Sequence, residues 1–296
     1  MKYFKPLKIF RGHSSIVDSV KFSPDGTKLV SASDDETIRI WDVDSGREIQ
    51  TLTGHFYPVH DAQFSPDGTM IVSCSSDKTI RLWDGKSYIE KAKFEGHSHA
   101  VSRVQFSPDG KTLVSASYDQ TIRIWDIQSE QEIKKINEHS EDVNDVQFSS
   151  DGQRIVSASD DQTIRIWDLV SDKRLQNFEG HTDNIMSAQF SPDNCYVISS
   201  SWDKTIRLWD VRSGTQIKKL VGHTNSINCA QFFPDGQTII SCSEDKTIRL
   251  WDVKLGVEIQ TLGECPKNLS RVDVSPNGNT FAAACYDGTI RLWGAI

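Results

Sequence analysis

The feature that most constrains the fold of this chain is a tryptophan that recurs every 42 residues. The seven copies are Trp41, Trp83, Trp125, Trp167, Trp209, Trp251 and Trp293, with no insertion or deletion between them. The surrounding residues recur too, most fully as Ser-Ser-Ser-Trp-Asp-Lys-Thr-Ile-Arg-Leu-Trp-Asp at 199–210. A unit this short cannot bury its own apolar face, so neighbouring units must stack and share a core. The sequence therefore predicts one domain over residues 1–296, built from seven repeats.

Within each repeat, β-prone runs alternate with turn residues. In the first copy the runs are Ile16–Phe22, Lys28–Ser33, Thr37–Trp41 and Glu48–Leu52. The first two are separated by Ser-Pro-Asp-Gly at 23–26, in which Pro presets φ, Asp bonds back to the backbone and Gly accepts positive φ. Strand-length runs joined by such turns favour an antiparallel meander. We therefore expect four strands in each repeat.

Most repeats also carry a Gly-His dipeptide ahead of the first run. It stands at 12–13, 54–55, 96–97, 180–181 and 222–223, with Glu-His at 138–139 as a partial copy. Together with the Trp-Asp dipeptides and the even period, these elements make the chain resemble the WD-repeat (Trp-Asp repeat) family over its whole length. The resemblance implies an all-β, seven-bladed β-propeller with four antiparallel strands per blade. It also implies a non-catalytic scaffold that binds proteins or peptides.

The two ends of the chain are out of phase with the repeat. Residues 6–10 precede the first Gly-His and correspond to the last strand of a unit, whereas Trp293 lies on a third strand. We therefore expect residues 3–12 to complete the blade formed by 263–296. Such closure hides sheet edges that would otherwise pair with other chains. A monomeric ring is the expected form.

Six repeats contain His, Ser and Asp, the residue types of a nucleophilic hydrolase. An active site is normally unique, whereas copies around a ring indicate architecture. The family resemblance implies that each trio forms a structural tetrad with its Trp, in which Trp bonds Ser, Ser bonds His and His bonds Asp. The sets are His13, Ser31, Asp35 and Trp41; His55, Ser73, Asp77 and Trp83; His97, Ser115, Asp119 and Trp125; His139, Ser157, Asp161 and Trp167; His181, Ser199, Asp203 and Trp209; and His223, Ser241, Asp245 and Trp251. In the seventh repeat Cys265 replaces His, Ala283 replaces Ser and Gly294 follows Trp293.

Composition limits the partners that we expect. A net charge of −8 disfavours nucleic acid, which needs a basic stripe, and no apolar run is long enough to span a membrane. The six cysteines include no Cys-x-x-Cys pair, so we expect free thiols, no metal site and no cofactor. Cys74 and Cys242 stand where other repeats hold a small residue and are expected as buried fillers. The expected location is intracellular, either cytoplasmic or nuclear.

An arginine also recurs two residues before each repeated tryptophan, from Arg39 to Arg291. Even spacing around a ring indicates equivalent contacts within each blade and not one basic patch. The aspartate that follows Trp is the expected partner.

Positions that differ from repeat to repeat are the best candidates for partner binding. The residue before the tetrad Asp reads Asp34, Ser76, Tyr118, Asp160, Trp202, Glu244 and Tyr286, and the fifth residue after the His position reads Asp18, His60, Ser102, Asn144, Met186, Asn228 and Ser270. The resemblance implies that both positions lie on the narrower face, around the central channel.

Carboxylates beside aromatic faces suit a cation, because a ring face adds about 0.5–2 kcal/mol to the Coulomb attraction. We therefore expect a basic, Lys- or Arg-containing segment as the partner. The expected binding residues are Trp202, Tyr118, Tyr286, Asp34, Asp160, Glu244, Asp18, His60 and Met186.

Other interpretations stay open at this stage. An acidic chain shows acids on its loops in any case, and a Tyr at a turn can simply pack on its neighbour. The ring can also be a sensory or autoinhibitory domain of a larger signalling protein, or an enzyme of propeller fold. A phosphopeptide would call for an arginine cluster at the variable positions, and these positions contain none.

Overall fold

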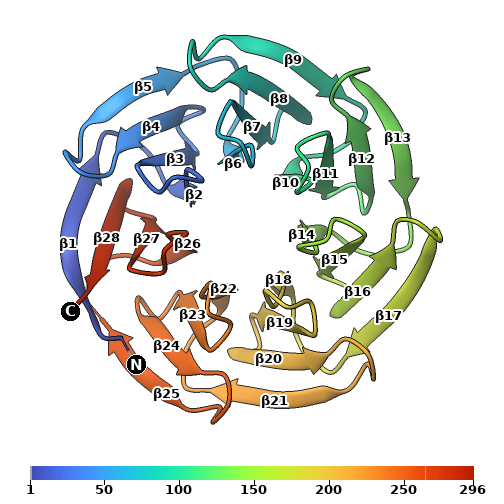
Figure 1. Ribbon diagram of the computed structural model, residues 1–296, viewed down its shortest axis with the longest axis vertical. Helices are drawn as coiled ribbons and strands as arrows, with labels where there is room; N and C mark the ends of the chain where they lie inside the picture. The colour runs from blue at the N-terminus through green and yellow to red at the C-terminus, as the bar shows by residue number, and fades with distance from the viewer. Residues whose placement is uncertain (1, 264) are drawn as a thin grey trace.

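The computed structural model describes residues 2–263 and 265–296, which contain 28 β-strands in seven four-stranded antiparallel sheets. Figure 1 shows the sheets arranged as blades around a central channel, with the first strand of each blade nearest the centre. The predicted all-β, seven-bladed propeller is confirmed. No helix in the described part of the chain has the length and apolarity that a membrane span requires.

The strands follow the order of the repeat. The innermost strands are β2 (Val17–Phe22), β6 (Val59–Phe64), β10 (Val101–Phe106), β14 (Val143–Phe148), β18 (Ile185–Phe190), β22 (Ile227–Phe232) and β26 (Leu269–Val274). The second strands are β3 (Lys28–Ser33), β7 (Met70–Ser75), β11 (Thr112–Ser117), β15 (Arg154–Ser159), β19 (Tyr196–Ser201), β23 (Thr238–Ser243) and β27 (Thr280–Cys285). The third strands are β4 (Ile38–Asp42), β8 (Thr79–Asp84), β12 (Ile122–Asp126), β16 (Thr163–Asp168), β20 (Thr205–Asp210), β24 (Ile248–Asp252) and β28 (Thr289–Ala295). The outermost strands are β5 (Glu48–Leu52), β9 (Glu90–Glu95), β13 (Gln131–Ile136), β17 (Lys173–Glu179), β21 (Gln216–Val221), β25 (Glu258–Leu262) and β1 (Phe4–Arg11). Blades 1 to 7 are numbered from β2 onward.

The ring closes as the phase of the repeat predicts. The N-terminal strand β1 pairs antiparallel with β28, from Phe4 opposite Ala295 to Arg11 opposite Thr289. Figure 1 shows both chain ends at this blade. Phe10 of β1 is buried and meets the edge of the Trp41 ring at a centroid distance of 5.9 Å. Blade 7 is thus assembled from the two ends of the chain.

The apolar core lies between neighbouring blades. Val30 and Ile40 of blade 1 pack with Val59, Phe64 and Trp83 of blade 2 in one buried cluster. Comparable clusters fill the space between the other blades. Each sheet therefore buries its apolar faces against the two neighbouring sheets, as in blade 1, which packs on blades 7 and 2.

A β-bulge in the innermost strand of every blade shapes the channel wall. In blade 4 the register shifts between Val143 and Asp145, and the same shift recurs in the other six blades. Asn144 then donates to the carbonyl of Ile185 at 3.0 Å, and Asp145 accepts from the amide of Ala188 at 3.2 Å, both in blade 5. Because a bulge breaks strict alternation, two consecutive side chains reach the neighbouring blade at the channel.

The cysteines form no disulfide within the described residues. Cys74 and Cys242 are fully buried at second-strand positions, in agreement with their expected role as small fillers.

Candidate functional site

The His, Ser and Asp residues of six blades form the same hydrogen-bonded arrangement with tryptophan. In blade 6, His223 Nδ1 lies 2.8 Å from Asp245 Oδ2, and His223 Nε2 lies 2.8 Å from Ser241 Oγ. Trp251 Nε1 donates to the same Ser241 Oγ at 2.8 Å. The serine is fully buried, and its oxygen already accepts from the indole. We interpret the arrangement as structural, because a nucleophile needs an accessible oxygen and these groups instead keep buried polar atoms paired.

Electrostatics agree with a fixed protonation state in these tetrads. Burial lowers the pKa of His181, which favours the neutral imidazole. Burial by itself would raise the pKa of Asp203, but hydrogen bonds from His181 and Thr205 outweigh it and lower that pKa. In this tetrad a neutral His181 therefore pairs with an ionised Asp203.

The glycine of the Gly-His dipeptide is required by close packing. A Cβ placed on Gly222 would lie 2.7 Å from Arg249 Nη1 and 2.9 Å from Trp251 Cη2. Blade 4 has Glu138 at this position, and there Trp167 Nε1 lies 3.4 Å from its serine, compared with 2.8–2.9 Å in the other five tetrads. The missing glycine thus coincides with the one stretched indole hydrogen bond.

Blade 7 replaces the tetrad with an aromatic cluster. Trp293 stacks on Phe281 at a centroid distance of 5.0 Å and an interplanar angle of 14°. Phe4 of β1 meets Phe281 at 5.1 Å and Phe233 of blade 6 at 5.5 Å. The substitutions Cys265 and Ala283 therefore accompany apolar contacts that join the closing strand to blades 6 and 7.

The repeated arginines do contact their own blades, but the expected partner was wrong. Arg39 Nη1 donates to Glu48 Oε2 on β5 at 2.6 Å, and its Nη2 lies 4.0 Å from the tetrad carboxylate of Asp35. Asp42, which follows Trp41, instead accepts from the amide of Ser45 at 2.7 Å and closes a turn. Residues separated by three positions along a strand point to opposite faces, so Arg39 cannot reach Asp42.

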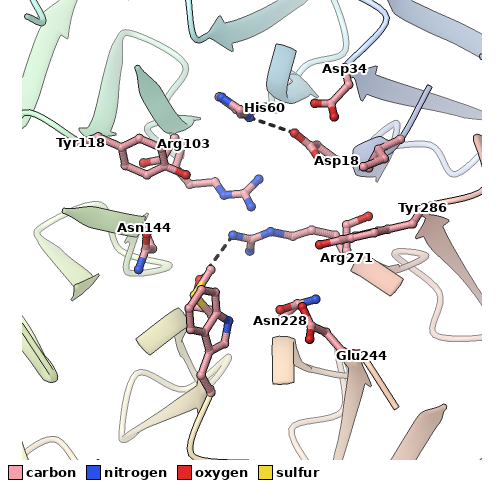
Figure 2. A pocket seen from close by; sticks show the side chains of 15 residues that line it. Asp18, Asp34, His60, Arg103, Tyr118, Asn144, Asn228, Glu244, Arg271 and Tyr286 are labelled. Carbon is pink, nitrogen blue, oxygen red and sulfur yellow. Dashed lines mark hydrogen bonds and ion pairs between the residues drawn. The ribbon is translucent and has the colours of Figure 1, made fainter. Parts of the chain in front are cut away.

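A pocket of about 340 Å³ occupies one end of the central channel, on the face that carries the turns between second and third strands. Figure 2 shows its side chains converging from several blades. It brings together eight of the nine predicted binding residues: Asp18, Asp34, His60, Tyr118, Met186, Trp202, Glu244 and Tyr286. We call this site the central pocket. That these residues bind a partner stays a prediction.

Three aromatic side chains form part of the wall of the central pocket. Tyr118, Trp202 and Tyr286 are 38%, 38% and 37% exposed, a high fraction for large apolar groups. Burial raises the pKa of Tyr118 to about 12. Burial and, after it, the negative charge of Glu244 raise the pKa of Tyr286 to about 12 as well. Both phenols therefore stay neutral, and their hydroxyl groups can donate hydrogen bonds.

The acids of the central pocket are already partly engaged. Asp18 Oδ2 lies 2.9 Å from His60 Nδ1, and the other ring nitrogen of His60 lies 2.7 Å from Ser76 Oγ. Burial and the neighbouring Asp18 raise the pKa of Asp34 to about 6. The ninth predicted residue, Asp160, does not line the pocket but accepts from Asn144 Nδ2 at 2.6 Å at its edge.

The sequence prediction missed two arginines, Arg103 and Arg271, that also line the central pocket. Figure 2 shows their guanidinium groups reaching toward each other from opposite sides. Both occupy the sixth position after the His position, a column that reads Ser19, Asp61, Arg103, Asp145, Ser187, Cys229 and Arg271. This column varies as much as the two columns that predicted the binding residues. In a strictly alternating strand, the fifth and sixth positions after the His position would point to opposite faces. The β-bulge turns both side chains toward the channel.

An exposed aromatic pair was missed as well. Phe56 and Tyr57, in the loop before β6, are 72% and 59% exposed, and the guanidinium of Arg81 lies 5.7 Å from the Phe56 ring. The other five His-containing repeats have polar residues at both positions: Ser14-Ser15, Ser98-His99, Ser140-Glu141, Thr182-Asp183 and Thr224-Asn225. Comparing these two columns would have found the pair.

Known proteins match this chain at two scales, that of a single repeat and that of nearly the whole ring. A stretch of 44 residues, 15% of this chain, is 48% identical to the ribosome biogenesis protein BOP1 homologues of Drosophila erecta and Drosophila melanogaster. A stretch of 48 residues is 44% identical to the homologue of Monosiga brevicollis. Each match covers only 6% of the relative's length, which is about one repeat. A family model described as the IFT122 first beta-propeller, in contrast, matches residues 16–294. The chain therefore belongs to the IFT122 first beta-propeller family and is a WD-repeat propeller.

Proposed function

We propose that this propeller is a non-catalytic scaffold whose central pocket captures a basic side chain of a protein or peptide partner. Propellers of the WD-repeat type are generally scaffolds for protein interaction, which gives the coarse function. The finer proposal rests on one observation, which is that carboxylates and exposed aromatic rings from different blades line the same pocket.

The acids gather on one side of the central pocket. The carboxylates of Glu244, Asp18 and Asp34 all lie close enough to Tyr286 to help raise the pKa of its phenol. An ammonium or guanidinium group placed over that ring would meet negative charge on several sides. A ring face adds about 0.5–2 kcal/mol to such binding once water is displaced. This arrangement supports a lysine or arginine as the captured residue.

His60 limits how many of these acids are available. Its imidazole already faces Asp18 at 2.9 Å, so the incoming cation is expected to depend more on Asp34 and Glu244. Met186 and Trp202 line the same pocket and offer apolar surface to the stem of a long basic side chain.

The proposal is tested by measuring fluorescence anisotropy with labelled peptides that contain Arg, Lys, Gln or phosphoserine at one central position. We expect the Arg and Lys peptides to bind at least about tenfold more tightly than the Gln peptide, and Trp202→Ala to weaken them by a similar factor. Ile133→Ala, on the exposed outer strand β13, is the matched control and should change nothing. Equal binding of basic and neutral peptides, or no loss with Trp202→Ala, would refute the proposal.

The pH dependence offers a second readout. Because the pKa of Asp34 is raised to about 6, its carboxylate gains a proton as the pH falls from about 7.5 to about 5.5, and the attraction for a cation weakens. Affinity for the Arg peptide should fall over that range in the native protein and fall less in Asp34→Asn. An unchanged affinity between the two pH values would contradict the role of Asp34.

Location and partners follow from this proposal only in outline. We propose an intracellular protein, cytoplasmic or nuclear, that acts as a monomeric ring and binds neither nucleic acid nor membrane. The similarity to BOP1 homologues covers a single repeat, so it supports the shared repeat architecture and does not by itself extend ribosome biogenesis to this chain.

A further inference from the structure

The two arginines of the central pocket have few well-placed acceptors among their neighbours. Arg103 is 8% exposed, and its side chain makes no hydrogen bond among residues 2–263 and 265–296. Its Nη1 forms an ion pair with Asp61 Oδ1 at 3.0 Å and its Nε lies 3.6 Å from Asp145 Oδ1, but neither contact has hydrogen-bond alignment. A buried guanidinium without aligned acceptors keeps capacity for an oxyanion.

Arg271 approaches from the other side of the channel and makes only long contacts. It is also 8% exposed, and its Nη1 lies 3.6 Å from Asp145 Oδ2 and 3.9 Å from Cys229 Sγ. Its Nη2 lies 3.5 Å from the carbonyl oxygen of Met186. All three contacts are long, so this guanidinium also lacks a strong acceptor in the described part of the chain.

The two guanidinium groups share one buried counter-charge. Arg103 comes from blade 3 and Arg271 from blade 7, and Asp145 of blade 4 lies near both at 3.6 Å. Asp61 and Asp145 are 1% and 0% exposed and do not line the central pocket, whereas both arginines do. Arg103 Nε and Nη1 are buried against these carboxylates, so the donor left for an acceptor in the pocket is Nη2, which makes no hydrogen bond among the described residues.

We propose that Arg103 and Arg271 together bind a carboxylate of the partner at the floor of the central pocket. This inference rests on the proposed capture of a basic group and adds a second requirement to it. Arginine matches the planar fork of a carboxylate, and two arginines on opposite sides can each donate to it. The occupant then carries a negative group beside its positive one.

The charge of the surrounding wall selects a carboxylate over a phosphate. Asp18, Asp34 and Glu244 line the same pocket, and a phosphomonoester carries about −1.5 to −2 charges at neutral pH. A singly charged carboxylate next to a lysine or arginine keeps the occupant neutral overall. The carboxylate can belong to an Asp or Glu side chain beside the basic residue, or to the C-terminus of a chain that ends in one.

The peptide experiment compares matched pairs by fluorescence anisotropy. One pair has Arg followed by Glu or by Gln, a second ends in Arg as the free acid or as the amide, and a third has Glu or Gln without any basic residue. We expect the carboxylate member of the first or the second pair to bind about tenfold more tightly, which identifies its source. A phosphoserine in place of Glu should bind no more tightly than Glu.

Protein variants then assign the effect to the arginines. Arg271→Gln combined with Asp145→Asn removes one guanidinium without leaving its carboxylate unpaired, and should reduce the Glu-to-Gln preference to below about threefold. Lys21→Gln with Asp273→Asn removes an ion pair of 2.9 Å outside the central pocket and should leave the preference intact. Thermal unfolding of both double variants checks that the ring is folded.

The two proposals fail in different ways. Equal binding of the Glu and Gln peptides and of the acid and amide peptides overturns the carboxylate site, even where a preference for Arg supports the proposed function. A Glu-over-Gln gain in the pair without a basic residue supports the carboxylate site independently of cation capture. A preference that persists in Arg271→Gln/Asp145→Asn, or phosphoserine binding tenfold tighter than Glu, overturns the assignment.

Discussion

Blades 1 to 6 and blade 7 stabilise the same architecture by different chemistry. In the first six, a buried indole, serine, imidazole and carboxylate are linked by hydrogen bonds, as in the set Trp251, Ser241, His223 and Asp245. In blade 7 the indole stacks on a phenyl ring and the phenyl of the N-terminal strand closes over it. The difference shows that the space around the repeated tryptophan can be filled either by a hydrogen-bonded tetrad or by an aromatic cluster.

The two solutions differ in how they depend on the rest of the chain. A tetrad is formed within one blade, whereas the aromatic cluster of blade 7 needs Phe4 from β1 and Phe233 from blade 6. In blade 7, the strand that closes the ring therefore also supplies part of the core. Four experiments test this contrast, in order of decreasing effect.

Removing the closing strand should have the largest effect. Deletion of residues 1–12 takes Phe4 and Phe10 out of the core and exposes the edge of β28. We expect loss of the cooperative unfolding transition and concentration-dependent aggregation, measured by circular dichroism and light scattering. Deletion of residues 1–2 alone is the control and should unfold like the full chain. A soluble, monomeric and cooperative product of the longer deletion would show that closure is dispensable.

Acid should destabilise the blades whose tetrad histidines have a lowered pKa. Burial lowers the pKa of His55, His97, His139 and His181 from 6.5, so the unfolded chain binds protons that the folded chain does not. Stability should be complete above the unfolded pKa and fall below pH 6.5, by about 1.4 kcal/mol per pH unit for each such histidine. Urea titrations at several pH values measure the slope. His55→Gln should reduce the slope, and His99→Gln, at an exposed loop position, should leave it unchanged.

Breaking a single tetrad should cost less stability than protonating several tetrad histidines at once. Ser241→Ala removes the acceptor of Trp251 Nε1 and the partner of His223 Nε2, both buried. We expect a loss of about 2–4 kcal/mol in the free energy of unfolding, since each unsatisfied buried group costs about 1–3 kcal/mol. Ser45→Ala, in an exposed turn, is the control and should cost less than about 0.5 kcal/mol. A cost below about 1 kcal/mol would mean that the tetrad hydrogen bonds contribute little.

The smallest effect concerns the glycine before the tetrad histidine. Gly222→Ala places a Cβ within 3 Å of both Arg249 and the Trp251 ring and should cost about 1–3 kcal/mol by overpacking. Glu138→Ala in blade 4, where the indole hydrogen bond is already long, should cost less than about 1 kcal/mol. Equal costs at the two positions would show that blade 4 has not relaxed around its larger residue.

Most of the fold could be predicted from the sequence, because a 42-residue period without gaps leaves one consistent arrangement of strands. The out-of-phase ends predicted the pairing of β1 with β28, and the variable columns predicted eight residues that meet in the central pocket. The departures in blade 7, Cys265 and Ala283, were also visible in the sequence. What replaces the lost tetrad was not, since Phe4, Phe233 and Phe281 come from distant parts of the chain.

The period by itself thus determined the number of blades, the strands and the way the ring closes, because these depend on local patterning repeated seven times. The side chains at the centre of the ring, in contrast, depend on how the blades pack together. The bulge in each innermost strand directs two consecutive side chains to the channel. It thereby adds Arg103 and Arg271 to a pocket whose predicted binding residues are mainly acidic and aromatic. A bulge depends on how neighbouring blades pack and twist, and alternation along a single strand cannot reveal it.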